Sequence, residues 1–207
     1  MTHRSSIAGQ AGGAAPAWWL DAVAAWQGKG AASYAASLVN LANPGTYDAA
    51  TGVLPAWDAG VGWTFNGSTY LNTTLTAAST AWSMAVRFAG VTDTNGGCGY
   101  YIDPGSKFFL RPSFNGQRTY ANGRENVVAG AQSSAVMIVA GKSCYLNGSP
   151  DGTIAGSGVS NGNTIAIGRI NAPEMYCLVG SVVAMAVWSR TLTPEEAASV
   201  SDAMEAL

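Results

Sequence analysis

The chain has 207 residues, a formal net charge of −2 and only 11% charged residues, against about 25% in typical globular proteins. Its ten lysines and arginines are scattered singly, so no basic stripe follows the sequence and nucleic acid is not an expected partner. No window approaches the roughly 18 consecutive apolar residues of a membrane span.

The first segment predicts an arm in front of one domain. Residues 1–16 are rich in Gly, Ala and Ser, and we expect a flexible N-terminal arm there, followed by a single domain over residues 17–207. The length fits one domain because all-β sandwiches of about 200 residues commonly form a single unit. The arm lacks the apolar run of about 7 to 15 residues that marks a standard secretory signal. We expect an extracellular or virion-surface protein, exported by another route or after removal of a signal.

A strand and a short helix are the first predicted elements. Residues 18–30, "WWLDAVAAWQGKG", predict an edge strand. The Ala-rich residues 31–42 predict one or two turns of helix, and the Asn-Pro-Gly sequence at 43–45 predicts their end.

Strands dominate the middle of the chain. "WTFNG" (63–67), "TYLNTTL" (69–75) and "AWSMAVRFAG" (81–90) alternate between apolar and polar residues. In the last of these, Arg87 lies on the face opposite to the one shared by Trp82, Met84, Val86 and Phe88, the period-2 pattern of a half-buried strand.

Turn signals then recur at short intervals up to residue 163, which favours a sandwich or barrel of many short strands. Residues 135–148 predict a hairpin, since Gly141 can take the positive φ of a two-residue turn with Lys142. Residues 163–169 and 178–190 predict two further strands.

A helix is predicted at the C-terminus. Thr193 is a candidate N-cap, Pro194 suits the first helical position, and Glu196 completes a capping box. Ala197, Val200, Met204 and Leu207 share one stripe, which predicts an amphipathic helix that packs on the sandwich.

Three segments resemble the laminin G-like and pentraxin-like jelly rolls of the concanavalin A-like lectin/glucanase superfamily. They are "WTFNGSTYLNTTLTAASTAWSMAVRF" (63–88), "CYLNGSPDGTIAGSGVSNGNTIAIGR" (144–169) and "LVGSVVAMAVWSRTLTPEEAASV" (178–200). The resemblance implies an all-β fold, an antiparallel jelly-roll β-sandwich, to which the sequence adds a short N-terminal helix and a C-terminal amphipathic helix. It is more specific for fold than for function.

The resemblance also makes calcium a candidate ligand, because pentraxin-like members hold calcium at two places that this chain partly matches. Asp93 and Asn95 match the first place, and Asn171 and Glu174 match the second. Calcium takes about six to eight oxygen ligands, several from carboxylates, and this set supplies few. The alternative is that Asp93 and Asn95 form a turn.

Catalytic patterns do not emerge. The E-x-D-x-E triplet of the superfamily's glucanases does not occur, although glycoside hydrolysis needs two carboxylates at one bond. The only histidine, His3, lies in the predicted arm, where a catalytic triad cannot rely on it. We expect no enzyme activity.

A non-catalytic carbohydrate-binding or adhesion module is the leading hypothesis. Sugars bind proteins through aromatic rings flanked by amide, carboxylate or guanidinium groups. The candidate sugar-binding residues are Arg87, Tyr100, Tyr101, Arg111, Arg118, Tyr120 and Asn122. The alternative for each is a side chain that completes a solvated sheet.

A structural component of a capsid, tail or surface layer is the second hypothesis. Low charge and the apolar sequence around Trp18 and Trp19 favour contact with a neighbouring subunit, so the chain is a candidate homo-oligomer. The alternative is that both tryptophans close the end of their own sandwich. Cys98, Cys144 and Cys177 fit either one disulfide with a free thiol or three reduced thiols, and we favour buried structural thiols.

Overall fold

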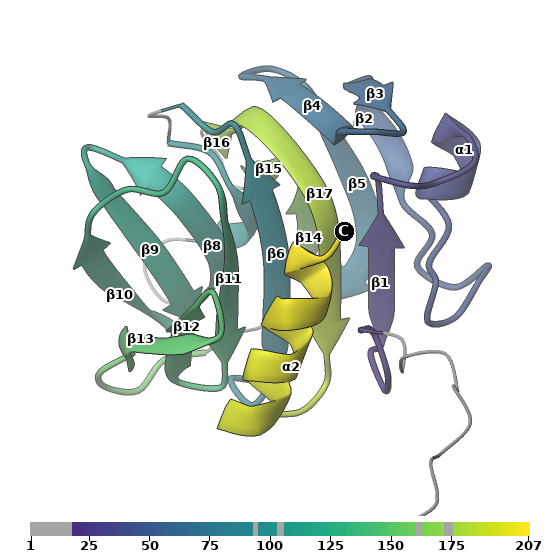
Figure 1. Cartoon of the computed structure of the whole chain (residues 1–207). Helices are drawn as coiled ribbons and strands as arrows, with labels where there is room; N and C mark the ends of the chain where they lie inside the picture. The colour runs from purple at the N-terminus through teal and green to yellow at the C-terminus, as the bar shows by residue number, and fades with distance from the viewer. Residues whose placement is uncertain (1–17, 93–94, 103–105, 160–162, 172–175) are drawn as a thin grey trace, which may run out of the picture.

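The computed structural model describes residues 18–92, 95–102, 106–159, 163–171 and 176–207, so the predicted arm lies outside the described residues. Within them the chain forms a jelly-roll β-sandwich, two mostly antiparallel sheets face to face, as the sequence predicts (Figure 1). In this part of the chain, no helix has both the length and the apolar character that crossing a membrane requires.

The first sheet has eight strands among the described residues, in the order β13-β12-β11-β6-β17-β4-β3, with β1 also paired to β17. The strands are β1 (Ala24–Gln27), β3 (Ala56–Asp58), β4 (Gly62–Asn66), β6 (Ser83–Ala89), β11 (Ala135–Ala140), β12 (Ser143–Leu146), β13 (Ser149–Thr153) and β17 (Val179–Trp188).

The second sheet has nine strands in the described part of the chain, in the order β10-β9-β8-β7-β14-β5-β2, with β15 paired to β7 and β16. The strands are β2 (Ala50–Val53), β5 (Tyr70–Thr76), β7 (Cys98–Ile102), β8 (Ser106–Phe114), β9 (Gln117–Asn122), β10 (Arg124–Ala129), β14 (Thr164–Ile167), β15 (Arg169–Asn171) and β16 (Tyr176–Cys177).

Alternation in the strands builds the core between the sheets. On β6, the side chains of Met84, Val86 and Phe88 are buried in this core, and Trp82 packs partly against it. On β4, Trp63 and Phe65 point into the same core. The period-2 prediction is therefore confirmed for both strands, because apolar residues two positions apart share one face.

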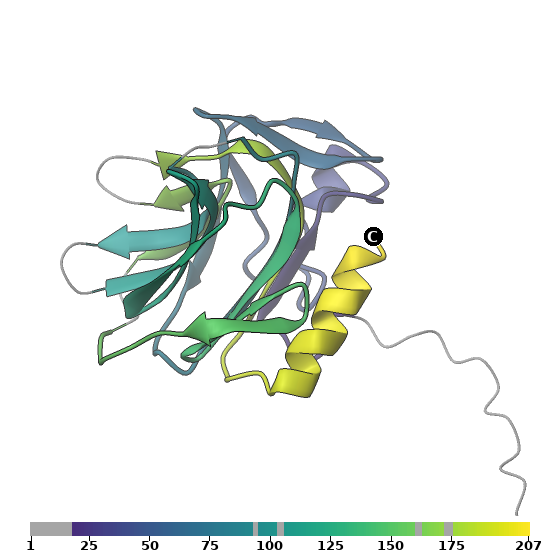
Figure 2. The ribbon, with the colours of Figure 1, turned by 60° about the vertical axis from the view of Figure 1, so that its left-hand side comes forward.

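The C-terminal helix α2 (Pro194–Glu205) covers the outer face of the eight-stranded sheet, as Figure 2 shows. The predicted capping box is present at Thr193 and Glu196. Ala197, Val200 and Met204 pack into a second apolar cluster with side chains of β6, β11 and β17, and this burial stabilises the helix. The predicted stripe is confirmed.

The N-terminal helix α1 (Tyr34–Ser37) is present but ends earlier than the sequence predicts. The Asn-Pro-Gly sequence at 43–45 does not end it. The chain leaves the helix after Ser37 and buries Asn40, whose Oδ1 accepts a hydrogen bond from the backbone N–H of Ala25 at 2.9 Å. Bonding to β1 therefore overrides helix propensity in this segment.

The predicted hairpin joins β11 and β12, and Gly141 has φ 57° in its turn. A second tight turn joins β8 and β9 at Asn115 and Gly116, which both have positive φ, as hairpin turns that match the twist of a sheet require. The turn at Asn115 and Gly116 fixes the register of β8, a strand that carries part of the site described below.

Candidate functional site

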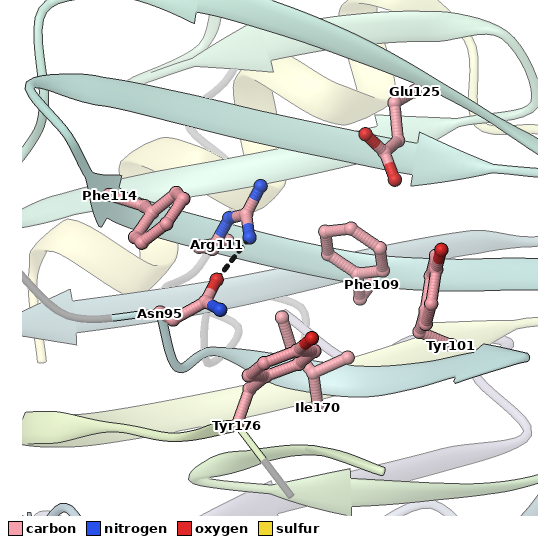
Figure 3. A pocket seen from close by; sticks show the side chains of 8 residues that line it. All are labelled: Asn95, Tyr101, Phe109, Arg111, Phe114, Glu125, Ile170 and Tyr176. Carbon is pink, nitrogen blue, oxygen red and sulfur yellow. Dashed lines mark hydrogen bonds between the residues drawn. The ribbon is translucent and has the colours of Figure 1, made fainter. Parts of the chain in front are cut away.

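A pocket of about 350 Å³ opens on the outer face of the nine-stranded sheet, the face turned away from the core (Figure 3). It lies over the middle strands of that sheet. The residues that line it are Asn95, Tyr101, Phe109, Arg111, Phe114, Glu125, Ile170 and Tyr176.

Strand alternation aims these side chains outward. On β8, Phe108 and Leu110 are buried in the core, so Phe109 and Arg111 face the opposite side. Phe114 joins them although it is three residues after Arg111, an odd spacing that would normally turn it inward. The register between β8 and β9 shifts between Arg111 and Phe114, and such an irregularity re-aims the side chains that follow it.

Aromatic rings form the floor of the pocket and one of its walls. Phe109 is buried at the base in a small apolar cluster with Ala121 and Ile170. Tyr101 packs edge-on against Phe109, with ring centroids 6.4 Å apart, and Tyr176 packs on the same cluster. The two tyrosines are half-buried, so each remains partly open to solvent beside the floor of the pocket.

Arg111 supplies the cationic group of the pocket. Its guanidinium lies between the rings of Phe114 and Phe109, 4.8 Å and 5.6 Å from their centroids (Figure 3). Nη1 donates a hydrogen bond to Asn95 Oδ1, and Nη2 donates one to Thr119 Oγ1 at 3.0 Å. Burial lowers the pKa of Arg111 from its usual value, and the Glu125 carboxylate partly opposes that shift.

Glu125 is the carboxylate of the pocket, and it is already engaged. Its Oε1 lies 2.7 Å from Lys107 Nζ, and the same ammonium lies 4.7 Å from the ring centroid of Tyr101. The arrangement gives aromatic surface with a guanidinium, a carboxylate and an amide at its edges. Such a surface can hold a ligand that is apolar on one face and rich in hydroxyl groups at its rim.

Two of the predicted sugar-binding residues, Tyr101 and Arg111, line this pocket. Their neighbour Tyr100 does not, because successive residues of a strand face opposite sides, and its ring is fully buried in the core. Of the two predicted tyrosines, only Tyr101 is therefore placed to contact a ligand in the pocket.

Arg118, Tyr120 and Asn122 are spaced two apart on β9, and all three are buried. Arg118 pairs with Asp151, and the hydroxyl of Tyr120 donates to the same carboxylate at 2.6 Å. The amide of Asn122 donates to the carbonyls of Thr80, Trp82 and Gly141. These polar groups join loops and sheets, so they are not placed to meet a ligand.

Arg87 faces outward from β6, as predicted, but α2 covers it. Its guanidinium donates hydrogen bonds to the backbone carbonyls of Met204 and Glu205, the latter at 2.6 Å. The prediction of Arg87 as a sugar-binding residue did not anticipate this helix, whose last carbonyls take up its donors.

Trp18 and Trp19 lie at the other end of α2, in contact with each other at 5.1 Å between ring centroids. Trp18 is only 8% exposed and packs in the apolar cluster beneath the helix, while Trp19 is half-buried beside it. Trp18 therefore packs within its own chain, which was the alternative to an assembly contact.

The candidate calcium ligands are only partly described, since Asp93 and Glu174 lie outside the described residues. Asn95 Oδ1 accepts a hydrogen bond from Arg111, and Asn171 Oδ1 accepts one from Arg169 at 3.0 Å. Oxygens already bonded to guanidinium groups are poorly placed to bind a cation. The described part of the set does not fit calcium, and no group of three His, Cys, Asp or Glu side chains gathers elsewhere in residues 18–92, 95–102, 106–159, 163–171 and 176–207.

Several pocket residues were not predicted as sugar-binding residues. They are Asn95, Phe109, Phe114, Glu125, Ile170 and Tyr176. Phe109 carries a usable signal, because it lies two residues from both Lys107 and Arg111 in "KFFLR" and so shares their face of the strand. Tyr176 carries none, since its place beside Ile170 depends on the pairing of β15 with β16.

Comparisons with known proteins reveal the fold and no family. No protein-family model matches the sequence, and neither does any curated protein. A mutant of Trypanosoma rangeli sialidase displaying trans-sialidase activity matches 90% of this chain at 14% identity, with a TM-score of 0.59. The match covers 34% of the sialidase, so the chain spans about a third of that protein's length.

Two further structures match as separate domains. Domain 4 of AbnA, a GH43 extracellular arabinanase from Geobacillus stearothermophilus in complex with arabinotriose, has 15% identity and a TM-score of 0.51, with 86% of each chain covered. The botulinum neurotoxin serotype D binding domain has 10% identity and a TM-score of 0.57, with 88% of this chain and 50% of that chain covered. At these identities the likeness establishes a shared jelly-roll sandwich and nothing about ligands.

Proposed function

We propose that this chain is a non-catalytic carbohydrate-binding module whose site is the pocket over β7 and β8. The observation that carries the proposal is the convergence of Tyr101, Phe109 and Tyr176 with the polar groups of Arg111 and Glu125 on one rigid sheet face. A pyranose ring has an apolar face that packs on aromatic rings and hydroxyl groups that need donors and acceptors around it.

The comparisons support the same proposal by analogy of fold. The arabinanase domain that matches this chain over 86% of both lengths was solved with arabinotriose, a sugar. We also propose that the chain belongs to the concanavalin A-like superfamily, which the three sequence segments resemble. An extracellular or surface location is part of the same proposal, because it suits an exported glycan-binding module.

The charges that line the pocket support the proposal that the site is non-catalytic. Most glycoside hydrolases place two carboxyl groups about one bond. Among the described lining residues Glu125 is the only carboxylate, and Lys107 holds it at 2.7 Å. We infer that the pocket binds its ligand without cleaving it.

A glycan array with the purified chain tests the proposal, followed by titration of the best ligand with Tyr101→Ala. Removing this ring should weaken binding about tenfold, because the lost apolar contact contributes about 1–2 kcal/mol to the binding free energy. The free energy of unfolding should stay near that of the wild type. Tyr34→Ala, at a half-buried tyrosine outside the pocket, is the matched control. Absence of glycan binding by the folded protein, or equal binding by both variants, would contradict the proposal.

A structural assembly role in a capsid, tail or surface layer is the second candidate. The observation that favours it is a groove of about 650 Å³ between the Trp18–Asp21 turn, Trp188 and α2. Leu20, at its edge, is 63% exposed. An exposed apolar side chain beside an apolar groove suits contact with a neighbouring subunit.

A further inference from the structure

Arg111 forms no ion pair with a carboxylate among the described residues. Three other cations of the described chain do form ion pairs, and each has its own acid: Lys107 with Glu125, Arg118 with Asp151, and Arg190 with Glu196. Arg111 is instead held by two neutral oxygens, those of Asn95 and Thr119. These bonds orient the guanidinium without neutralising it.

Part of the guanidinium is left for a ligand. A guanidinium has five N–H donors, two on each Nη and one on Nε. Asn95 takes one donor of Nη1 and Thr119 takes one of Nη2. Nε is enclosed and has no hydrogen-bond partner in the described structure. One N–H on each Nη is therefore left without a partner in these two hydrogen bonds, and a carboxylate or a sulfate can accept from two N–H groups of one guanidinium.

The residues around Arg111 strengthen the attraction between its guanidinium and an anion. Phe109 and Phe114 flank the guanidinium and displace water from its faces, so its attraction to an anion is greater than at an open surface. The same enclosure lowers the pKa of Arg111, although a guanidinium stays charged at neutral pH.

The charges around the pocket also favour an anion. The described ionic groups there are Arg111, Lys107 and Glu125, and the last two form an ion pair with each other. Among the described residues the pocket therefore holds one positive charge that no ion pair offsets, in a chain whose formal net charge is −2. This small positive site lies in the same pocket as the half-buried Tyr101 and Tyr176.

We propose that Arg111 makes this pocket selective for an acidic sugar residue, one that carries a carboxylate or a sulfate group. The inference rests on the proposed carbohydrate-binding function and deepens it. The sugar ring packs on the tyrosines, and its anionic group receives two hydrogen bonds from the remaining N–H groups of Arg111. A hydrogen bond to a charged group contributes more than one between neutral groups, so the acidic sugar gains about tenfold in affinity or more.

A glycan array of matched pairs tests this selectivity. Each glycan with a uronic acid stands beside the same glycan with that carboxylate esterified, and each sulfated glycan stands beside its unsulfated form. The two kinds of pair distinguish a carboxylate from a sulfate. We expect the acidic member of at least one kind to bind about tenfold more tightly, with affinity that falls as salt is added.

Three variants assign the selectivity to a residue. Arg111→Gln should bind both members of a pair equally, and Arg111→Lys should keep only part of the preference because it lacks the planar fork. Arg124→Gln is the control, since Arg124 is an exposed arginine on neighbouring β10 that does not line the pocket. It should retain the full preference, and urea unfolding of each variant verifies that the fold persists.

The outcomes separate the two proposals. Equal binding of acidic and neutral members, weakened by Tyr101→Ala, would overturn the acidic selectivity and leave the carbohydrate-binding proposal intact. A preference for acids that survives Arg111→Gln would also overturn it. Binding of no glycan of either kind would overturn both proposals.

Discussion

Arg118 on β9 and Asp151 on β13 form a two-point ion pair between the nine-stranded and the eight-stranded sheets. Arg118 Nε donates to Asp151 Oδ2 at 2.6 Å, and Nη2 donates to Oδ1. The other donor nitrogen, Nη1, bonds the carbonyls of Ala129 and Gly130 at 2.6 Å each. The pair therefore fastens the sheets together at the edge where β10 and β13 lie.

Asp151→Asn should destabilise the fold by about 3 kcal/mol, because it leaves the Arg118 guanidinium without its counter-charge where only 9% of that side chain is exposed. Urea unfolding measures the loss. Asp202→Asn, which removes an exposed carboxylate from α2, is the control and should change stability by less than about 0.5 kcal/mol. Equal losses in both variants would mean that the pair contributes little.

The contribution of Asp151 should also depend on pH. Burial alone would raise the pKa of this carboxyl group, but hydrogen bonds from Arg118 and Tyr120 outweigh burial and hold the pKa below its ordinary value. An aspartate in the unfolded state has a pKa of about 3.9, so the stabilisation is present in full above that pH. It is lost as the pH falls through the lower pKa of the folded state.

Unfolding measured across the acidic range checks this sign. The difference in unfolding free energy between the wild type and Asp151→Asn should be constant near neutral pH and shrink below about pH 4. A difference that grows on acidification would contradict the lowered pKa.

Arg87 should matter for stability and not for ligand binding. Arg87→Met keeps most of the side-chain volume but removes the donors to the Met204 and Glu205 carbonyls and the positive charge at the C-terminus of α2. We expect a loss of about 1–2 kcal/mol, with faster hydrogen exchange in α2. Glycan affinity should equal that of wild type, and a loss of affinity at unchanged stability would return Arg87 to the list of ligand-binding residues.

The sequence predicts the fold well because alternation and turn chemistry are local. Met84, Val86 and Phe88 had to share a face whatever their partners, and the capping box of Thr193 and Glu196 lies within four residues. The site is less predictable because it requires knowing which face is covered. Arg87 and Arg111 look alike in the sequence, yet α2 covers one and the other lines a pocket.

Long-range partners explain the other differences. Arg118 resembles a surface arginine until β13, which begins 31 residues later, brings Asp151 to it. Phe114 reaches the pocket only because the register of β8 shifts after Arg111. Neither the Arg118–Asp151 contact nor the register shift leaves a local pattern in the sequence. Predicting which of Tyr100 and Tyr101 faces the pocket, in contrast, required only the orientation of one strand.

The three cysteines should react with thiol reagents at different rates. None forms a disulfide in the structure, and Cys98 and Cys144 are buried while Cys177 is partly exposed. Burial raises the pKa of the Cys98 thiol to about 12 and that of Cys144 to about 11, which suppresses the reactive thiolate. At neutral pH we expect Ellman's reagent to modify Cys177 first and the other two only in urea.

Cys177→Ser is the control for this assignment and should abolish the early phase. If only one cysteine of the wild type reacts with the reagent in urea without reductant, then the other two are paired in a disulfide and the description of three free thiols is wrong.

Assembly through the groove beside α2 should depend on Leu20 rather than on the tryptophans. Trp188 Nε1 donates to the Leu20 carbonyl at 2.9 Å, which holds the turn in place and leaves the leucine side chain exposed. Trp18→Ala removes a buried ring and should cost about 3 kcal/mol or more, so a change in its association would be ambiguous. Leu20→Ser should cost less than about 0.5 kcal/mol.

Sedimentation of Leu20→Ser over a range of concentrations therefore reports on the interface alone. If the groove is an assembly contact, the substitution removes apolar area from it and the variant sediments as a monomer at concentrations where wild type self-associates. Val127→Ser is the matched control, since Val127 is an exposed apolar residue, at 47%, on β10 of the other sheet. Identical sedimentation of wild type and Leu20→Ser would count against the assembly role. Of the two proposed functions, glycan binding in the pocket over β7 and β8 would then remain.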